Sequence, residues 1–411
     1  MRAKLTPEAV ARAGLCTGCG LCESALGPER VEMQMSPDGF LRPRTKVELT
    51  ETEVSQFERL CPGVLLEHLD PSYTYDVIWG PIETVRVGYA KDPEVRFKGS
   101  SGGALSAILL YLLETGEVDF VVQTAAAADP LRNTSFAATS RAEVIAAAGS
   151  RYSPSSPLSQ IHEFLEMPGR FAFVGKPCDV AGLRNLARHD PRVDDKVAYM
   201  ISFMCAGIPS QRGTEEILKV MGIVQSEVAS MRYRGEGWPG MTTVVTKSGH
   251  RAAMNYQTAW GRILNRHLQL RCKICADGTG EFADVVCADA WYGDDAGFPS
   301  FDEQEGRSLI VSRTDRGEHL VCSCIKHSSL YAEPLPLTEI VKMQPYQAQR
   351  KRMVRSRLFA FRLLGRHVPL YMRMGVADAA RTVPRLQRVR TVLGTLRRLL
   401  VDGLWAAGGV K

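Results

Sequence analysis

The chain has 411 residues, 45% hydrophobic and 23% charged, which is ordinary for a globular protein with room for two or three domains. No stretch approaches about eighteen uninterrupted apolar residues, and residues 1–15 carry charges without an apolar core, so we expect neither a transmembrane helix nor a signal peptide. Eleven cysteines in such a chain indicate metal or redox use in the reducing cytoplasm rather than a disulfide framework.

The net charge of +6 is unevenly distributed. Of the 51 Lys and Arg and 45 Asp and Glu, residues 342–411 hold 16 basic and 2 acidic residues, which leaves 35 basic and 43 acidic for residues 1–341. A mildly acidic body therefore carries a strongly basic tail, which needs an explanation of its own.

Near the N-terminus, Cys16, Cys19 and Cys22 stand at Cys-x2-Cys-x2-Cys spacing, and Cys61 follows with a trailing proline. Three cysteines so spaced can bind three corners of a cubane cluster, and no closer cysteine is available as the fourth ligand than Cys61. Four-cysteine zinc sites usually come as two separated pairs, so zinc and plain buried thiols are the weaker alternatives. We expect a [4Fe-4S] cluster in a ferredoxin-like module of residues 1–70.

Strand-like and helix-like segments then alternate. Segments 84–90, 118–122, 171–175 and 197–204 are typical of strands, and segments 104–113 and 210–221 of helices. This rhythm predicts an α/β domain over residues 71–341, with a mixed or largely parallel sheet that collects ligands at the carboxyl ends of its strands.

A second set of cysteines lies in this domain. Cys178 and Cys205 each follow a predicted strand, and Cys272 and Cys275 form a Cys-x2-Cys pair. A second [4Fe-4S] cluster accounts for all four, although zinc suits the pair equally well. Taken singly, they could be buried thiols, and Cys178 at a helix start could be a low-pKa nucleophile. Cys287 lies in a predicted strand.

Two polar loops could face a cofactor. The run from Gly99 to Gly103 opens a helix, where glycines let an anion approach backbone N–H groups and serines add donors. The segment 149–157 offers Arg151 for phosphate, Tyr152 for stacking, and several hydroxyls. The plainer alternatives are a serine cap with a flexible turn, and a proline-stiffened surface loop.

Taken in order along residues 15–333, these motifs resemble the beta subunit of the coenzyme F-420 (deazaflavin) hydrogenase/dehydrogenase, a family that includes flavin-dependent reductases of chlorophyll metabolism. The resemblance implies FAD beside two [4Fe-4S] clusters, although some members carry one cluster. It implies Cys178, Cys205, Cys272 and Cys275 as ligands of the second cluster. The FAD contacts that it implies are Gly99, Ser100, Ser101, Gly102, Gly103, Ser150, Arg151, Tyr152, Ser153 and Lys176.

The sequence departs from the family pattern in two places. Residues 278–282 differ, and Cys287 stands where a residue other than cysteine is expected, so Cys287 is an alternative to Cys178 as a ligand. The tail after about residue 344 lies outside the resemblance.

The tail has helical periodicity. Apolar residues between Val389 and Leu404 fall at helical spacing among arginines, which predicts an amphipathic basic helix, and residues 357–374 suggest another, interrupted by Gly365 and Pro369. The tail could pack on the body or on another copy of the chain, or it could attach peripherally to the anionic inner face of a membrane. Nucleic acid is the weakest candidate, because no basic platform interleaved with aromatic residues is present.

We therefore expect a cytoplasmic iron–sulfur flavoprotein oxidoreductase. Electrons from ferredoxin or another one-electron donor would pass through the clusters to FAD and on to a small organic substrate, or in reverse, with deazaflavin among the candidates. A noncatalytic electron-relay subunit is the alternative, and a zinc-stabilised thiol protein a third. The catalytic residues stay unassigned, and the polar candidates for a proton donor are Tyr152, His162, Lys176 and Asp289.

Overall fold

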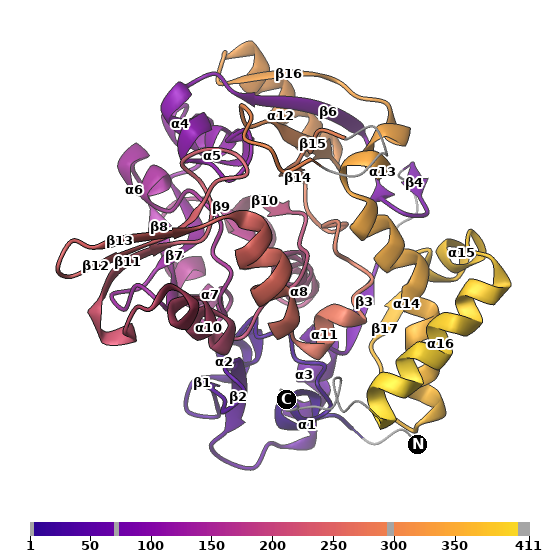
Figure 1. Ribbon diagram of the computed structural model, residues 1–411. Helices are drawn as coiled ribbons and strands as arrows, with labels where there is room; N and C mark the ends of the chain where they lie inside the picture. The colour runs from indigo at the N-terminus through magenta and orange to yellow at the C-terminus, as the bar shows by residue number, and fades with distance from the viewer. Residues whose placement is uncertain (1–3, 70–73, 294–299, 402–411) are drawn as a thin grey trace.

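The computed structural model describes residues 4–69, 74–293 and 300–401 (Figure 1). Its centre is an eight-stranded sheet with the strand order β16–β6–β15–β14–β10–β9–β7–β8. In that order the strands span Leu330–Pro334, Thr84–Ala90, Ser308–Ser312, Val285–Asp289, Val197–Phe203, Phe171–Gly175, Phe120–Ala126 and Asn133–Ala138.

The sheet is mixed. Strands β14, β10, β9 and β7 are parallel to one another, whereas β15, β6 and β16 on one side and β8 on the other pair antiparallel. The carboxyl ends of the four parallel strands therefore meet at one edge, as the alternating pattern predicts. The α/β class is confirmed. The sheet is parallel in its middle and antiparallel at both sides.

Alternate side chains of each strand enter two different cores. On β9, Phe171 and Phe173 face a core that includes α8 (Pro177–Ala187), whereas Ala172 and Val174 face the core formed with α5 (Ala104–Glu114) and α12 (Asp315–Lys326). A strand that is buried on both faces reads as a continuous apolar run, which explains the segment Phe-Ala-Phe-Val.

The N-terminal module shares the first of these cores. Leu15 and Phe57 belong to the same apolar cluster as Phe173 of the central sheet, so the module packs directly on the sheet. Its elements are α1 (Pro7–Arg12), α2 (Leu21–Leu26), β1 (Val31–Met35), β2 (Leu41–Thr45), α3 (Glu51–Leu60) and β3 (Leu65–Glu67). Helix α3 begins at a capping box formed by Thr50 and Glu53.

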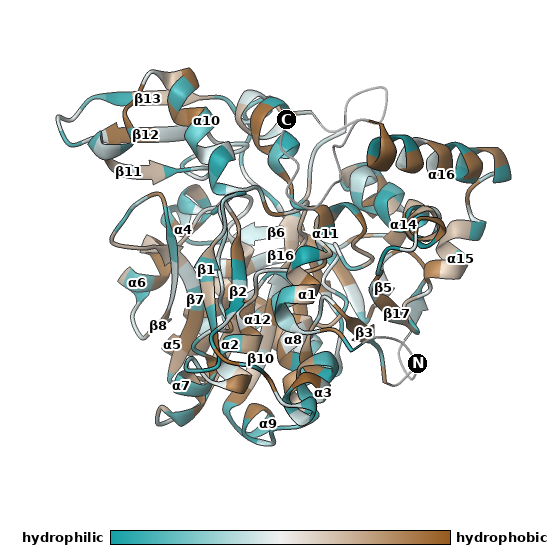
Figure 2. Cartoon of the chain, turned by 90° about the horizontal axis from the view of Figure 1, so that it is seen from below, coloured by the Kyte–Doolittle hydropathy of each residue, from teal (hydrophilic) through white to brown (hydrophobic). Residues whose placement is uncertain are grey.

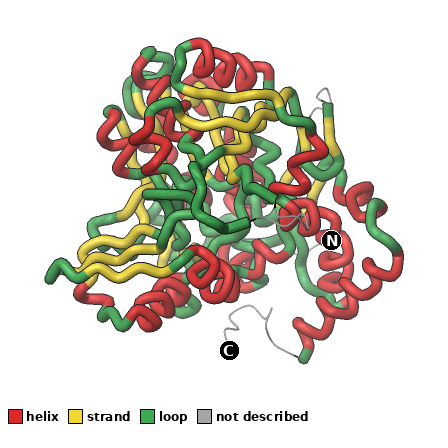
Figure 3. The backbone as a smooth tube through the Cα atoms, turned by 45° about the horizontal axis from the view of Figure 1, so that its top comes forward, coloured by secondary structure: helices red, strands yellow, loops and turns green. Residues whose placement is uncertain are grey.

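A separate three-stranded antiparallel sheet has a core of its own. It consists of β11 (Val228–Arg232), β12 (Thr242–Thr246) and β13 (Arg251–Met254), and it packs against α10 (Gln211–Met221) and the π-helix η2 (Gln257–Ile263). Figure 3 shows irregular loops gathered between this sheet and the central one. The remaining elements are β4 (Tyr75–Asp76), β5 (Gly80–Pro81), α4 (Pro93–Lys98), α6 (Arg141–Ala146), α7 (Ile161–Glu166), α9 (Arg192–Lys196), η1 (Gln225–Glu227), η3 (Leu264–His267), α11 (Leu270–Lys273), η4 (Leu337–Glu339) and α13 (Ile340–Met343).

The tail is helical, as expected, but it is also part of the body. It contains α14 (Pro345–Leu363), β17 (Leu370–Met372), α15 (Val376–Arg381) and α16 (Arg385–Leu400). Strand β17 pairs in parallel with β3 of the N-terminal module, and α14 places Val354 and Phe361 in the first core. Of the suggested helix over residues 357–374, the first part is the end of α14, and the interruption at Gly365 is confirmed, because α14 ends at Leu363 and Gly365 adopts a left-handed conformation. The part beyond Gly365 is wrong, since Leu370–Met372 forms a strand. Among the described residues, no helix combines the length and apolarity that crossing a membrane requires.

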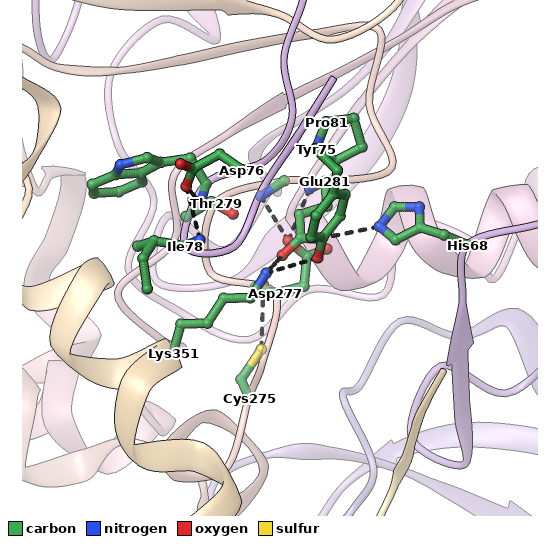
Figure 4. A network of polar contacts seen from close by, with 12 residues as sticks. His68, Tyr75, Asp76, Ile78, Pro81, Cys275, Asp277, Thr279, Glu281 and Lys351 are labelled. Atoms are coloured by element: carbon green, nitrogen blue, oxygen red, sulfur yellow. Dashed lines mark hydrogen bonds and ion pairs between the residues drawn. The ribbon is translucent and has the colours of Figure 1, made fainter. Parts of the chain in front are cut away.

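A buried ionic network joins the tail to the body (Figure 4). Lys351 of α14 forms an ion pair with Glu281, and the same carboxylate accepts hydrogen bonds from Tyr75 Oη at 3.0 Å and from His68 Nε2 at 3.1 Å. Burial alone would raise the pKa of Glu281, but Lys351 and then His68 lower the pKa to about 2. A carboxyl group whose pKa falls on folding stabilises the fold above its ordinary pKa, and this contribution is lost as the pH falls towards 2.

We predict that Lys351→Met lowers the free energy of unfolding by about 3–5 kcal/mol at neutral pH, because it leaves a buried carboxylate without its cation. It should also flatten the loss of stability between about pH 4.5 and 2, since Glu281 then no longer has so low a pKa. Urea unfolding followed by circular dichroism measures both effects. The control is Lys342→Met, which removes an exposed ion pair with Glu339 and should change little. Equal effects of the two variants would contradict this account.

Candidate functional site

The first set of thiols converges on a single cavity. Cys16, Cys19, Cys22 and Cys61 all line a space of about 430 Å³, its mouth included, whose other walls are mostly apolar. Burial raises the pKa of Cys19 to about 11, and burial followed by the neighbouring thiols raises the pKa of Cys22 well above its ordinary value. Such a group of buried thiols suits a positively charged centre that binds them as thiolates.

Two glycines shape the loop that carries these cysteines. Gly18 and Gly20 have φ angles of +78° and +86°, in the left-handed region that favours glycine. A Cβ atom on Gly20 would lie 2.7 Å from the backbone nitrogen of Ser159. The small residues between the cysteines are therefore needed for the turn and for its contact with the central domain.

The second set comes together from three separate segments. Cys178 lies in the first turn of α8, Cys205 follows β10, and Cys272 and Cys275 flank the end of α11. Burial raises the pKa of Cys178 and of Cys205, and the proximity of Cys272 raises both further. The four predicted residues of this set are thus neighbours in space.

Cys287 lines a large cleft, described below, together with Cys205, but its thiol is buried in a different core from the second set. It lies on β14 in the core beside α5 and α12, together with Cys324, and burial alone raises the pKa of its thiol to about 12. The structure therefore groups Cys178, and not Cys287, with Cys205 and Cys272. All eleven cysteines are free thiols. Within residues 4–69, 74–293 and 300–401, no three His, Cys, Asp or Glu side chains form a group suited to a single metal ion.

A glutamine and an arginine connect the two sets. Gln269 Nε2 lies 3.3 Å from the carbonyl oxygen of Thr17, between two cysteines of the first set, and 3.4 Å from Cys272 Sγ of the second. Arg271 Nη2 donates to the carbonyl oxygen of Pro62 at 3.1 Å, next to Cys61. Segments about 250 positions apart in the sequence are therefore in hydrogen-bond contact.

Two buried guanidinium groups lie beside the second set. Arg271 and Arg350 are almost fully buried, and no carboxylate within the described ranges forms an ion pair with either. Arg350, on α14, donates to the carbonyl oxygens of Cys205 and Ala206. Burial opposes the charge of both arginines, but Tyr371 beside Arg271 and Tyr346 beside Arg350, followed by the thiols of the second set, raise their pKa values. The tail therefore supplies positive charge to the second cysteine set.

A large cleft opens at the carboxyl edge of the parallel strands. It encloses about 1550 Å³, open mouth included, and residues from the ends of β7, β9, β10 and β14 line it. Cys205 of the second set is among these residues. Most of the expected cofactor contacts line the cleft as well, namely Gly99, Ser100, Ser101, Gly103, Ser150, Arg151, Tyr152 and Lys176. Ser150 Oγ donates to Ser100 Oγ at 2.8 Å, so the two predicted loops touch.

Two expected contacts do not line the cleft. Gly102 packs against β15, where its N–H donates to Ser308 Oγ at 3.0 Å, and a Cβ atom would lie 2.7 Å from the Ser308 nitrogen. Ser153 is buried and donates to Gln211 Oε1 at 3.0 Å. Gly103, with φ +73°, approaches the Val95 carbonyl oxygen so closely that a Cβ would lie 2.6 Å away. Close packing against neighbouring backbone atoms thus explains why positions 102 and 103 are glycines.

Arg151 lines the cleft, but its donors face the protein. Its guanidinium group donates to Asn133 Oδ1 at 2.8 Å and to the carbonyl oxygens of Met231 and Pro130 at 2.9 Å each. The residue fixes its loop against the three-stranded sheet. Most of its donors are therefore taken up by the protein, and the phosphate contact that the sequence suggests stays a prediction.

Three polar side chains lie beside the cleft. Lys176 was predicted from the sequence, but Asp179 and Gln123 were missed. Lys176 Nζ forms an ion pair with Asp179 Oδ2 at 2.7 Å, and although burial opposes its charge, Asp179 holds the pKa of Lys176 above its ordinary value. Asp179 Oδ1 and Gln123 Nε2 are buried and have no hydrogen-bond partner in the described part of the chain. Gln123 ends the apolar run Phe-Val-Val on β7, and a lone polar residue after such a run was the available signal.

Arg234 and aromatic residues form another wall that sequence reasoning missed. Arg234 Nη1 and Nη2 bind both carboxylate oxygens of Asp289 at 2.9 and 2.8 Å, and Nη2 also donates to the carbonyl oxygen of Ser100 at 2.5 Å. The guanidinium carbon lies 4.6 Å from the ring centre of Tyr256 and 5.2 Å from that of Trp291.

Three of the four candidate proton donors line the cleft, and the fourth does not. Tyr152, Lys176 and Asp289 line the cleft, although Asp289 is held by Arg234. His162 lies on α7, away from the residues that line the cleft, with its Nε2 3.8 Å from Asp190.

Comparisons with known proteins identify the family of the chain. Residues 85–162 match the family model for the N-terminal part of the coenzyme F420 hydrogenase/dehydrogenase beta subunit, and residues 169–337 match the family model for its C-terminal part. The coenzyme F420 hydrogenase subunit beta of Methanococcus voltae is 24% identical over 295 residues, which cover 68% of this chain and 96% of that protein.

Two further proteins are similar. The coenzyme F420-dependent sulfite reductase of Methanocaldococcus jannaschii is 24% identical over 82% of this chain and 49% of its own length. A chain of the F420-reducing [NiFe] hydrogenase complex from Methanosarcina barkeri has a similar fold, with a TM-score of 0.53 and 20% identity over 72% of this chain and 96% of that chain. The two family models together span more than half of the sequence. The family expected from the motifs is thus confirmed, and the chain belongs to the coenzyme F420 hydrogenase/dehydrogenase beta subunit family.

Proposed function

We propose that the chain is an iron–sulfur flavoprotein oxidoreductase, in which two [4Fe-4S] clusters connect a one-electron donor such as ferredoxin with FAD in the cleft, and FAD with an organic substrate. Electrons could flow in either direction along the same path. One observation carries the proposal: both cysteine sets and the cleft are contiguous, since Gln269 contacts both sets and Cys205 lines the cleft.

The eight cysteines fit two cubane clusters. The first four line one apolar cavity, and the second four lie among buried arginines. An iron–sulfur cluster stores and passes single electrons, and the net charge and hydrogen bonds around its sulfur atoms set its reduction potential. In this chain Gln269 Nε2 and the Ile208 N–H lie 3.4 Å from Cys272 Sγ and would serve as such donors.

The cleft fits a flavin dinucleotide. Its position at the carboxyl edge of the parallel strands is where ligands bind in α/β folds, and it is large enough to admit a dinucleotide. Gln123 Nε2 and Asp179 Oδ1 offer an unpaired donor and acceptor, Lys176 supplies a cation, and Ser100 and Ser150 add hydroxyl groups. A bound flavin would take up electrons singly and pass them on as a pair.

The names of the similar proteins suggest which partners and substrate this chain could have. Several are named as subunits of F420-dependent enzymes, among them an F420-dependent formate dehydrogenase of Methanococcus maripaludis. These names support a partner subunit for this chain and a deazaflavin as a candidate substrate. They equally favour the second candidate function, an electron relay without a substrate of its own.

We predict that the chain, purified without oxygen, contains about eight irons, matching acid-labile sulfide and one FAD. Cys19→Ser should remove about half of the iron, because it breaks one cluster. The matched control is Cys287→Ala, which removes a buried cysteine outside both sets and should leave the iron content unchanged. Iron retained in full by Cys19→Ser, or a colourless preparation that contains zinc, would contradict the proposal.

Gln123→Leu should weaken FAD binding about tenfold, because it removes the unpartnered amide of a residue that lines the cleft. The iron content should stay the same, so flavin fluorescence on release, measured beside an iron assay, separates the two sites. Ser153→Ala is the contrasting variant, since Ser153 does not line the cleft, and should leave FAD affinity near normal. The opposite ranking of the two variants would refute the proposed flavin site.

Turnover distinguishes the two candidate functions. The enzyme should reduce a deazaflavin with reduced viologen as an artificial donor and no other subunit present. A relay should accept electrons from viologen but reduce the substrate only after its partner subunit is added. Failure of the pure chain to take up any electrons would exclude both.

A further inference from the structure

Helix α16 carries an exposed apolar ridge. Leu386, Val389, Leu393 and Leu400 recur at helical spacing on one side of the helix, and their exposed fractions are 62%, 53%, 60% and 67%. Four large apolar residues, each more than half exposed on one helix, are unlike the scattered apolar residues that any surface has. Figure 2 shows α16 at one end of the molecule, with hydrophobic and hydrophilic bands along its length.

The other side of α16 holds the helix firmly to the body. Thr395 and Leu399 are buried, and Thr391 Oγ1 lies 3.2 Å from Met353 Sδ of α14. Helix α14 is in turn fixed by Lys351 and Arg350 in the interior. The ridge is therefore presented outward by a helix that is packed on its inner side.

Arginines flank the ridge. With 3.6 residues per turn, Arg390 and Arg397 fall along one edge of the apolar side and Arg385 along the other. The sequence of α16 contains no acidic residue, and Arg385, Arg388, Arg390, Arg397 and Arg398 make it strongly basic. The neighbouring helix α14 also has two exposed apolar residues, Phe359 and Leu363, with exposed fractions of 52% and 56%.

We propose that the outward face of α16, formed by Leu386, Val389, Leu393 and Leu400 with the flanking Arg385 and Arg390, docks on the anionic surface of a lipid bilayer. The helix would lie in the plane of the interface, with its apolar side chains below the headgroups and its guanidinium groups beside lipid phosphates. The proposal concerns a surface remote from the cleft and does not rest on the proposed redox function.

Charge complementarity favours a lipid surface over a protein partner. An apolar helix face flanked only by cations suits a surface that is continuously anionic above and apolar below. The cationic α16 of a second copy would repel this face if the two helices packed against each other. An acidic partner protein and a second copy in another arrangement are the occupants that the test must distinguish.

The test is flotation of the full chain with vesicles. We expect the chain to float with vesicles of phosphatidylcholine and phosphatidylglycerol in equal parts, and to stay at the bottom with phosphatidylcholine alone. Leu393→Glu should weaken this binding more than about tenfold, because it places a carboxylate in the apolar ridge. Arg385→Gln with Arg390→Gln should weaken it and reduce its dependence on salt. All three residues are exposed, and circular dichroism verifies that each variant is folded.

The matched control is Val220→Glu, which alters an equally exposed apolar residue on α10 and should bind the vesicles as the unaltered chain does. Three results would overturn the proposal. The first is no flotation with anionic vesicles, and the second is flotation that Leu393→Glu leaves unchanged. The third is a dimer in sedimentation that Leu393→Glu dissociates while lipid binding is absent, which would assign the ridge to a second copy.

Discussion

The structure depends on holding two groups of buried thiols against each other in the interior. Thiols packed together without solvent resist ionisation, as the raised pKa values of Cys22 and Cys178 show. The arrangement is stable only because the surrounding chain fixes each group. Gln269 and Arg271 do this directly, since their hydrogen bonds join the loop of one set to the loop of the other.

The central sheet and the tail position the second set of thiols. The parallel strands bring Cys178 and Cys205 to one edge of the central sheet, next to the cleft. The basic tail, which the sequence presents as an appendage, closes the second set from outside, because Arg350 reaches the backbone of Cys205 and Lys351 neutralises Glu281. The inner face of α14 thus contacts the second cysteine set, whereas the adjoining α16 exposes an apolar ridge on the outside.

Much of this arrangement was predictable from local patterns. The cysteine spacing predicts the first set, and the family resemblance implies the second. The apolar runs predict the strands after which Cys178 and Cys205 stand. The contact between Gln269 and Thr17 was not predictable, because pairing across about 250 positions leaves no local signal. The same holds for Arg234 and its ion pair with Asp289. Arg151 shows the converse: its residue type suggested a phosphate ligand, but neighbouring carbonyl groups take up most of its donors, which no local pattern indicated.

The central claim is that two iron–sulfur clusters lie side by side in this chain. Electron paramagnetic resonance of the anaerobic protein, fully reduced with dithionite, tests it most directly. The account predicts two reduced clusters whose signals are broadened by magnetic interaction, with a simpler, unbroadened spectrum in Cys19→Ser. A reduced sample without any cluster signal, or with one signal that Cys19→Ser leaves unchanged, would contradict the account.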